Sequence, residues 1–196
     1  LALVANNRDT RKPFSYGTIP LEHAIRGFYG VELWEQTYYA TEALLATQLN
    51  HQLIEEKGSR RRYAPTKEAK PGGIIDILWD SKEGSGLSGA GTIHHIAFDT
   101  PSDADQLLVR EKVQKGGFNP TPVIDRQYFH SIYFREPGGV LFEVATTPPG
   151  FTADESLEEL GTSLKLPAWH ENRREWIESL LEPITLKADT YVSPNV

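Results

Sequence analysis

The same order of predicted strands and helices occurs twice in this chain of 196 residues. Apolar runs bounded by Gly, Pro, Ser and Asn predict a strand, a helix and three further strands within residues 24–80, and again within residues 91–147. The glycine pairs at 72–73 and 138–139 align the two copies at an offset of 66 residues. This internal repeat predicts two similar βαβββ units in tandem, and hence an α+β fold.

The second copy holds two polar residues of interest inside its apolar strands, His95 and Glu143. At an offset of 66 the first copy has Tyr29 and Ile77 in their places. A buried, unpaired carboxylate costs several kcal/mol, so a cation beside Glu143 is expected, and a metal shared with His95 would supply it. The alternative is a carboxylate that faces solvent. A pair needed only for folding would recur in both copies, which favours a site in the second copy.

Composition narrows the class of protein. The chain is 39% hydrophobic and 24% charged, as in a globular protein with a real core. Its formal net charge of −7 argues against a nucleic-acid partner. No apolar run approaches the ~18 residues of a membrane span. Cysteine is absent, which excludes disulfides and catalytic thiols and fits a cytoplasmic protein.

Three segments are predicted along the chain. Residues 17–150 form the module of two repeats. Residues 151–196 form a C-terminal extension with one amphipathic helix over 171–181. Residues 1–16 combine a short apolar strand at 1–5 with a polar linker, and that strand resembles 141–145. We therefore expect 1–5 to be the last strand of a missing N-terminal module. The chain has no methionine and starts with Leu, as expected of a processed or excerpted sequence.

Several stretches resemble one known superfamily. They are GTIHHIAF at 91–98, VIDRQYF at 123–129, YFREPGG at 133–139 and LGTSLKLP at 160–167. With them the chain resembles the vicinal-oxygen-chelate superfamily of glyoxalases, bleomycin-resistance proteins and extradiol dioxygenases, and is most similar to hydroquinone-type ring-cleaving dioxygenases. The resemblance implies tandem βαβββ units that form a half-open β-barrel, with a metal on the concave face.

The resemblance also implies an activity, which is oxygen-dependent opening of an aromatic diol ring at non-haem Fe(II). The family's iron is held by two His and one Glu, and two of these ligands fall on His95 and Glu143. The third falls on a unit outside this sequence, so the chain looks like the C-terminal half of such an enzyme. Mn or another divalent metal, or no metal in this chain, are the alternatives. The implied partners are a small aromatic diol, dioxygen, and either the missing N-terminal half or a second copy.

Three more residues receive site roles from the resemblance. A three-residue turn would place Tyr133 opposite Glu143, where its phenol could donate to a bound oxygen. Arg126 could pair with the phenolate oxygen remote from the metal. Strict alternation along the strand turns His94 away from His95, so His94 is at most an outer residue around the site. A core-filling Tyr133, a surface Arg126 and a packed or solvated His94 are the structural alternatives.

Two other functions stay open, because this scaffold supports many chemistries. One is a metal-dependent isomerase or lyase of the glyoxalase type. The other is a metal-free module that binds small aromatic molecules.

Overall fold

The computed structural model describes residues 1–15, 18–82, 84, 86–87 and 89–183. The chain divides into two compact units. One is formed by Gly30–Leu160 and contains both repeats, and the other is formed by the flanking segments on either side of it. Gly30–Leu160 carries the candidate site.

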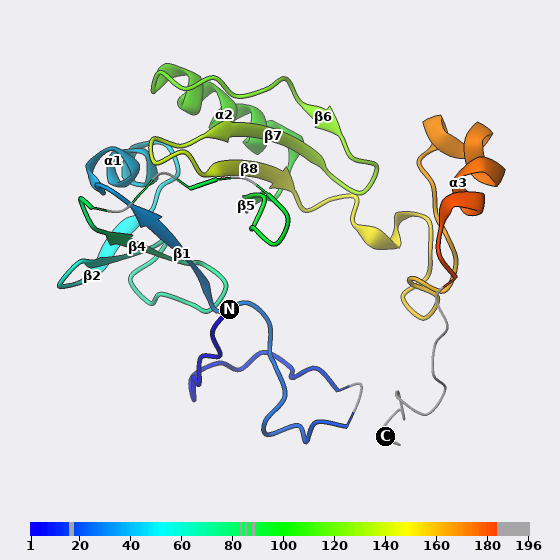
Figure 1. The fold of residues 1–196 in the computed structure, drawn as a ribbon, viewed down its shortest axis with the longest axis horizontal. Helices are drawn as coiled ribbons and strands as arrows, with labels where there is room; N and C mark the ends of the chain where they lie inside the picture. The colour runs from blue at the N-terminus through cyan, green and yellow to red at the C-terminus, as the bar shows by residue number, and fades with distance from the viewer. Residues whose placement is uncertain (16–17, 83, 85, 88, 184–196) are drawn as a thin grey trace. The chain divides into compact units, whose positions relative to one another are not determined.

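The first repeat folds as one mixed sheet with a helix (Figure 1). Its elements are β1 (Gly30–Glu35), α1 (Tyr39–Thr47), β2 (Gln52–Lys57), β3 (Arg60–Ala64) and β4 (Ile74–Trp79). The strand order is β1-β4-β3-β2, and β1 is parallel to β4 while the other pairs are antiparallel. The helix α1 crosses from β1 to β2, and the antiparallel pairs β2–β3 and β3–β4 then bring β4 back parallel to β1.

The second repeat has the same topology. Its elements are β5 (Ile96–Thr100), α2 (Asp103–Lys115), β6 (Ile124–Asp125), β7 (His130–Arg135) and β8 (Leu141–Thr146). The order is β5-β8-β7-β6, again with a parallel first pair. Helix α2 starts where the Ser102 hydroxyl accepts a hydrogen bond from the Asp105 amide at 3.1 Å, and a glycine with φ of 88°, Gly117, follows its end.

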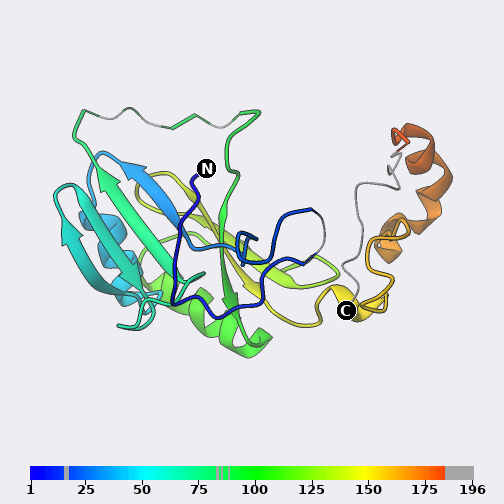
Figure 2. The ribbon, with the colours of Figure 1, turned by 90° about the horizontal axis from the view of Figure 1, so that it is seen from below.

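Among the described residues the two repeats form two four-stranded sheets that do not close on each other, which confirms the predicted half-open α+β fold (Figures 1 and 2). Side chains from both repeats build one hydrophobic core. Its buried members are Leu33, Leu44, Leu45, Tyr63, Ile75, Ile77, Val113, Ile132, Phe134, Phe142 and Val144. Alternate residues of β4, β7 and β8 enter this core, so the residues between them lie on the opposite face of the sheet.

The residue pairing between neighbouring strands shows that the predicted offset of 66 between the repeats is wrong. Val31 pairs with Ile75 in the first sheet, and Ile96 pairs with Phe142 in the second. Because all four side chains pack in or against the core, the first strands match at an offset of 65 and the last strands at 67. Both offsets are odd, and they are the values closest to 66 that agree with the strand pairing in each sheet.

An odd offset changes which residues share a face, since a shift of one residue turns a side chain to the other side of the sheet. Gly30 and Asp76 therefore occupy the positions of His95 and Glu143, and the assignment of Tyr29 and Ile77 is wrong. The two glycine pairs misled the alignment. Strand β4 begins directly after its glycines, whereas Val140 separates the second pair from β8.

Outside the two sheets the chain is mostly irregular. Residues 1–5 form no strand here, and their predicted origin in a preceding module stays a prediction. The extension contains short 3₁₀ turns at Phe151–Ala153 and Ala168–Arg173 and the helix α3 (Arg174–Leu180), three residues shorter at its start than predicted. Residues 184–196 of the predicted extension lie outside the described residues. No helix in the described part of the chain has the length and apolarity to cross a membrane.

Candidate metal and substrate site

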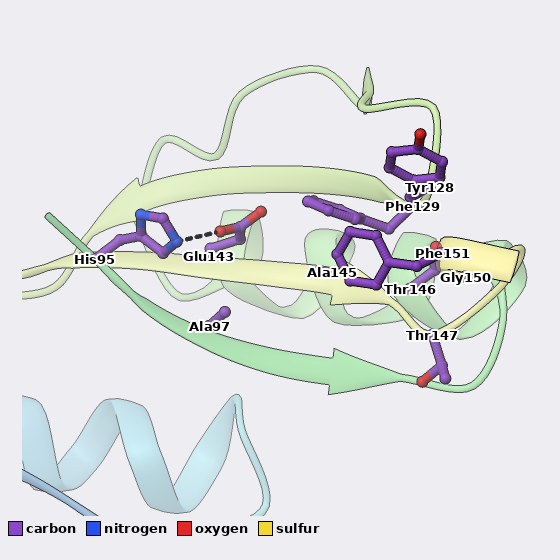
Figure 3. Close-up of a pocket in the computed structure, with 10 residues that line it drawn as sticks. All are labelled: His95, Ala97, Tyr128, Phe129, Glu143, Ala145, Thr146, Thr147, Gly150 and Phe151. Carbon is purple, nitrogen blue, oxygen red and sulfur yellow. Dashed lines mark ion pairs between the residues drawn. The ribbon is translucent and has the colours of Figure 1, made fainter. Parts of the chain in front are cut away.

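The candidate site is built around a buried carboxylate in the middle of β8. Glu143 is 3% exposed, and it lies on the face of the sheet opposite the core because its neighbours Phe142 and Val144 pack into the core. His95 stands immediately before β5, the strand parallel to β8. Its Nε2 lies 2.8 Å from Oε2 of Glu143 (Figure 3). The structure thus brings the two predicted metal ligands together.

Tyr133 lies opposite Glu143 on the antiparallel strand β7, as the turn length predicted. Its phenol donates a hydrogen bond of 2.6 Å to Oε1 of Glu143. Its ring meets the His95 ring edge to face, with 6.0 Å between the centroids. One carboxylate therefore has a histidine on one oxygen and a phenol on the other.

Arg126 extends this group toward solvent. Its Nη2 lies 3.4 Å from the Tyr133 hydroxyl, and its guanidinium stacks 5.4 Å from the centroid of that ring. The backbone amide of Arg126 donates to the Phe129 carbonyl at 2.9 Å, which closes the turn before β7. The exposed side chain leaves other guanidinium hydrogens available to a ligand.

The prediction that His94 turns away from His95 is wrong. The two rings share a hydrogen bond of 2.8 Å between their Nδ1 atoms. Alternation does not apply because β5 begins only at Ile96, so neither histidine is held by the ladder. His94 is exposed and contacts the ring nitrogen of His95 that faces away from Glu143.

The donor types at this site fit a divalent metal. An imidazole nitrogen and a carboxylate oxygen are two of the three ligands of a 2-His-1-carboxylate face. Two ligands about 2.1 Å from one metal and at right angles would stand about 3 Å apart, close to the 2.8 Å between His95 and Glu143. The described residues contain no group of three or more His, Cys, Asp or Glu side chains that could hold a metal. His95 and Glu143 thus fit two of the three protein ligand positions, and the described part of the chain offers no third of these types beside them.

A cavity of about 490 Å³ adjoins the two ligands, a size typical of small-molecule sites (Figure 3). His95 and Glu143 bound one end, and Phe129 and Phe151 line the other. The prediction from sequence missed the residues of this apolar end. Their only signal in the sequence is the aromatic pair at 128–129, next to Arg126.

The first repeat holds an ion-pair cluster where the second holds the candidate site. Asp76 accepts hydrogen bonds from Arg62 at 2.7 Å and from Arg60. Burial raises the pKa of Asp76, but these two guanidinium groups outweigh burial and lower it overall. At the position of His95, a Cβ on Gly30 would lie 2.7 Å from the Ile74 carbonyl oxygen. The first repeat thus has a carboxylate but no space for the histidine.

Two buried glutamic acid side chains, Glu35 of the first repeat and Glu136 of the second, meet at the hydroxyl of Thr41. The Thr41 hydroxyl lies 2.8 Å from Glu35 and 2.6 Å from Glu136, and both carboxyl groups are buried. Glu136 also accepts the backbone amides of Gly138 and Val140, each at 2.7 Å. Burial, and then the charge of Glu136, raise the pKa of Glu35 to about 7. Glu35 therefore keeps its proton at pH values well above the usual range of a glutamic acid.

Comparison with known proteins agrees with this architecture. Residues 31–144 match the family model of the Glyoxalase/Bleomycin resistance protein/Dioxygenase superfamily. The chain belongs to this superfamily. Within it, the matched segment runs from β1 to β8 and so contains both sheets.

Relatives in this superfamily include a Bacillus subtilis (strain 168) protein named "Putative ring-cleaving dioxygenase MhqO", which is 36% identical over 95% of this chain and 59% of its own length. Another is the "Chlorohydroquinone/hydroquinone 1,2-dioxygenase" of Sphingobium indicum, 32% identical over 89% of this chain and 55% of its own length. A crystal structure of a Bacillus subtilis "putative dioxygenase" has a TM-score of 0.83 and 37% identity, and covers 91% of this chain and 57% of that one. The chain spans little more than half the length of these relatives.

Proposed function

We propose that this chain is the part of a ring-cleaving dioxygenase that contributes His95 and Glu143 to non-haem Fe(II) and binds an aromatic diol. One observation carries the proposal: His95, Glu143, Tyr133 and Arg126 converge on one face of a sheet, beside a cavity large enough for a small ring. The names of the relatives support the same class of reaction.

The chemistry that bound iron supplies is Lewis-acid polarisation of the diol and activation of dioxygen. The protein residues have separate tasks. Tyr133, whose phenol lies at the end of the cavity that holds Glu143, can turn its proton toward an oxygen of the substrate. Arg126 offers a cation for negative charge on the ring oxygen remote from the metal. His94 holds the Nδ1 side of His95 and so orients its ring.

The third protein ligand is expected from outside this sequence, since the described residues offer only two. We propose a histidine from an N-terminal half, either in the same longer protein or in a second polypeptide. A second copy of this chain is the alternative source. A cytoplasmic location is part of the proposal and is consistent with a chain that has no cysteine.

The test is to purify this chain alone and together with the product of the coding sequence upstream of residue 1. Ferrous iron content, hydroquinone consumption and dioxygen uptake are measured for both samples and for the His95→Ala and Glu143→Ala variants. We expect full iron content and turnover only in the combined sample, and loss of both in either variant. Turnover that persists in both variants would disprove the assignment of the site.

A further inference from the structure

The cavity beside His95 and Glu143 has two chemically different ends. On the concave face, the rung that contains Ala97, Glu143 and Tyr133 is followed along β8 by Ala145, which pairs with Ser131. All polar groups that contact Glu143 therefore lie at one end. Beyond Ala145, the lining residues are Tyr128, Phe129, Thr146, Thr147, Gly150 and Phe151.

Small side chains create the space between the two ends. Ala97 and Ala145 lie on neighbouring strands and present only a methyl group each to the cavity (Figure 3). Residues as large as Val or Leu at either position would extend into the volume that a ligand would occupy. These alanines thus separate the polar end from the aromatic end by a shallow apolar floor.

The aromatic end is held in place by contacts among its own lining residues and with Asp154. The rings of Tyr128 and Phe151 pack with centroids 5.1 Å apart, and the Tyr128 hydroxyl donates to Asp154 at 3.1 Å. The Gly150 amide donates to the Tyr128 carbonyl at 2.9 Å, which joins the two chain segments. Phe151 nevertheless remains 63% exposed, so this lining residue offers a large apolar surface to a ligand.

We infer that this end of the cavity binds an apolar substituent of the diol ring, and that Ala145 and Phe151 set the preference for substituted over unsubstituted rings. The inference rests on the proposed function for the position of the ring oxygens, which lie at the His95 and Glu143 end. A substituent on the ring then extends over Ala145 toward Phe151. Each methyl group buried there should tighten binding about fourfold. A charged substituent gains nothing, because no described cation lines this end.

The test uses binding rather than turnover. Dissociation constants of hydroquinone, methylhydroquinone, tert-butylhydroquinone and 2,5-dihydroxybenzoate are measured under anaerobic conditions, by calorimetry, on the 196-residue chain with Mn²⁺ and without it. We expect tert-butylhydroquinone to bind at least tenfold more tightly than hydroquinone, and the benzoate to bind no more tightly than hydroquinone in the sample without Mn²⁺, where its carboxylate has no metal to chelate. Ala145→Leu should abolish the preference for the tert-butyl ring.

Two further variants show whether a change in binding comes from the cavity or from a disturbed fold. Phe151→Ala changes an exposed ring, so it should leave the fold intact while it reduces the preference for tert-butylhydroquinone about threefold or more. Ala43→Leu makes the same enlargement as Ala145→Leu on an exposed face of α1 and should leave every dissociation constant unchanged. Circular dichroism checks the fold of each variant.

The outcomes separate this inference from the proposed function. Equal affinity for substituted and unsubstituted rings, or an equal effect of Ala145→Leu on both, overturns the inference even if hydroquinone is consumed in the turnover assay. A preference for substituted rings that both variants remove, without oxygen-dependent consumption in any sample, supports the inference and overturns the proposed reaction. Absence of binding by every diol overturns both.

Discussion

Arg62 and Tyr133 occupy equivalent rungs of the two sheets, and each lies opposite a buried carboxylate of the neighbouring last strand. Arg62 neutralises Asp76 with a full positive charge, whereas Tyr133 gives Glu143 a neutral hydrogen bond. Asp76 is therefore paired with two arginines, whereas Glu143 contacts His95 and Tyr133. The same position in the fold therefore produces an internal ion pair in one repeat and a candidate ligand in the other.

This difference predicts a pH-dependent effect of Arg62→Met. The lowered pKa of Asp76 stabilises the fold above the pKa of the unfolded chain, and that stabilisation is lost as pH falls through the folded-state pKa. Arg62→Met removes one of the two arginines that stabilise ionised Asp76, so the free energy of unfolding at pH 7 should fall by roughly 3 kcal/mol. Urea denaturation should show the gap to the parent chain narrowing below about pH 4. Arg8→Met, at an exposed arginine, is the control, and a gap independent of pH would contradict the prediction.

The contribution of Glu35 to the free energy of unfolding should depend on pH in the direction opposite to that of Asp76. Burial and the charge of Glu136 raise the pKa of Glu35 to about 7, from the 4.5 of an unperturbed glutamic acid. The folded state therefore binds the proton more tightly, and stability falls as pH rises from 4.5 to about 7. The full decline from this group is about 3 kcal/mol. Glu35→Gln should remove it and raise the melting temperature at pH 8, while Glu158→Gln should not. A variant that keeps the parent slope would show that Glu35 is not the titrating group.

Metal affinity should depend on the histidines in a graded way. His95→Ala removes a ligand, so Mn²⁺ binding by the chain should become undetectable by calorimetry. His94→Ala removes only the contact that orients His95, and we expect about a tenfold loss. His130→Ala is the matched control, since His130 contacts Asp103 at 2.7 Å and lies outside the site. Equal losses for His94→Ala and His95→Ala would contradict the assigned roles.

Tyr133→Phe should separate turnover from metal binding. The variant keeps the ring but removes the hydrogen bond to Glu143. In the complete enzyme we expect kcat to fall roughly 100-fold, with iron content and the dissociation constant of the diol nearly unchanged. Tyr39→Phe, at an exposed tyrosine of α1, controls for loss of a phenol. A fall in iron content without a fall in kcat per iron would make Tyr133 a structural residue.

Local patterns were sufficient to predict the strands and helices of both repeats. Apolar runs and glycine turns mark each element, and the three-residue turn before β8 places Tyr133 opposite Glu143. The offset between the repeats was beyond such patterns. For the last strands it depends on a single residue, Val140, between the glycines and β8, and no local propensity distinguishes an offset of 66 from 67 there or from 65 at the first strands.

Contacts between segments far apart in the chain also could not be predicted from the sequence. Thr41 and Glu136 are 95 residues apart in the chain, and only the packing of the two repeats brings them to 2.6 Å. The contact of His94 with His95 was missed for a different reason. Alternation was extended to a residue that precedes the strand, where the ladder no longer fixes side-chain direction.

Gly30 has an evolutionary consequence. The two repeats share a topology, as expected of a duplication, but their capacity for metal chemistry cannot be exchanged by small steps. A histidine at position 30 would force the Ile74 carbonyl out of its place beside β1, and Asp76 would remain neutralised by two arginines. A Gly30→His substitution alone would therefore not create a second centre, so a metal site in the first repeat would require several coordinated changes.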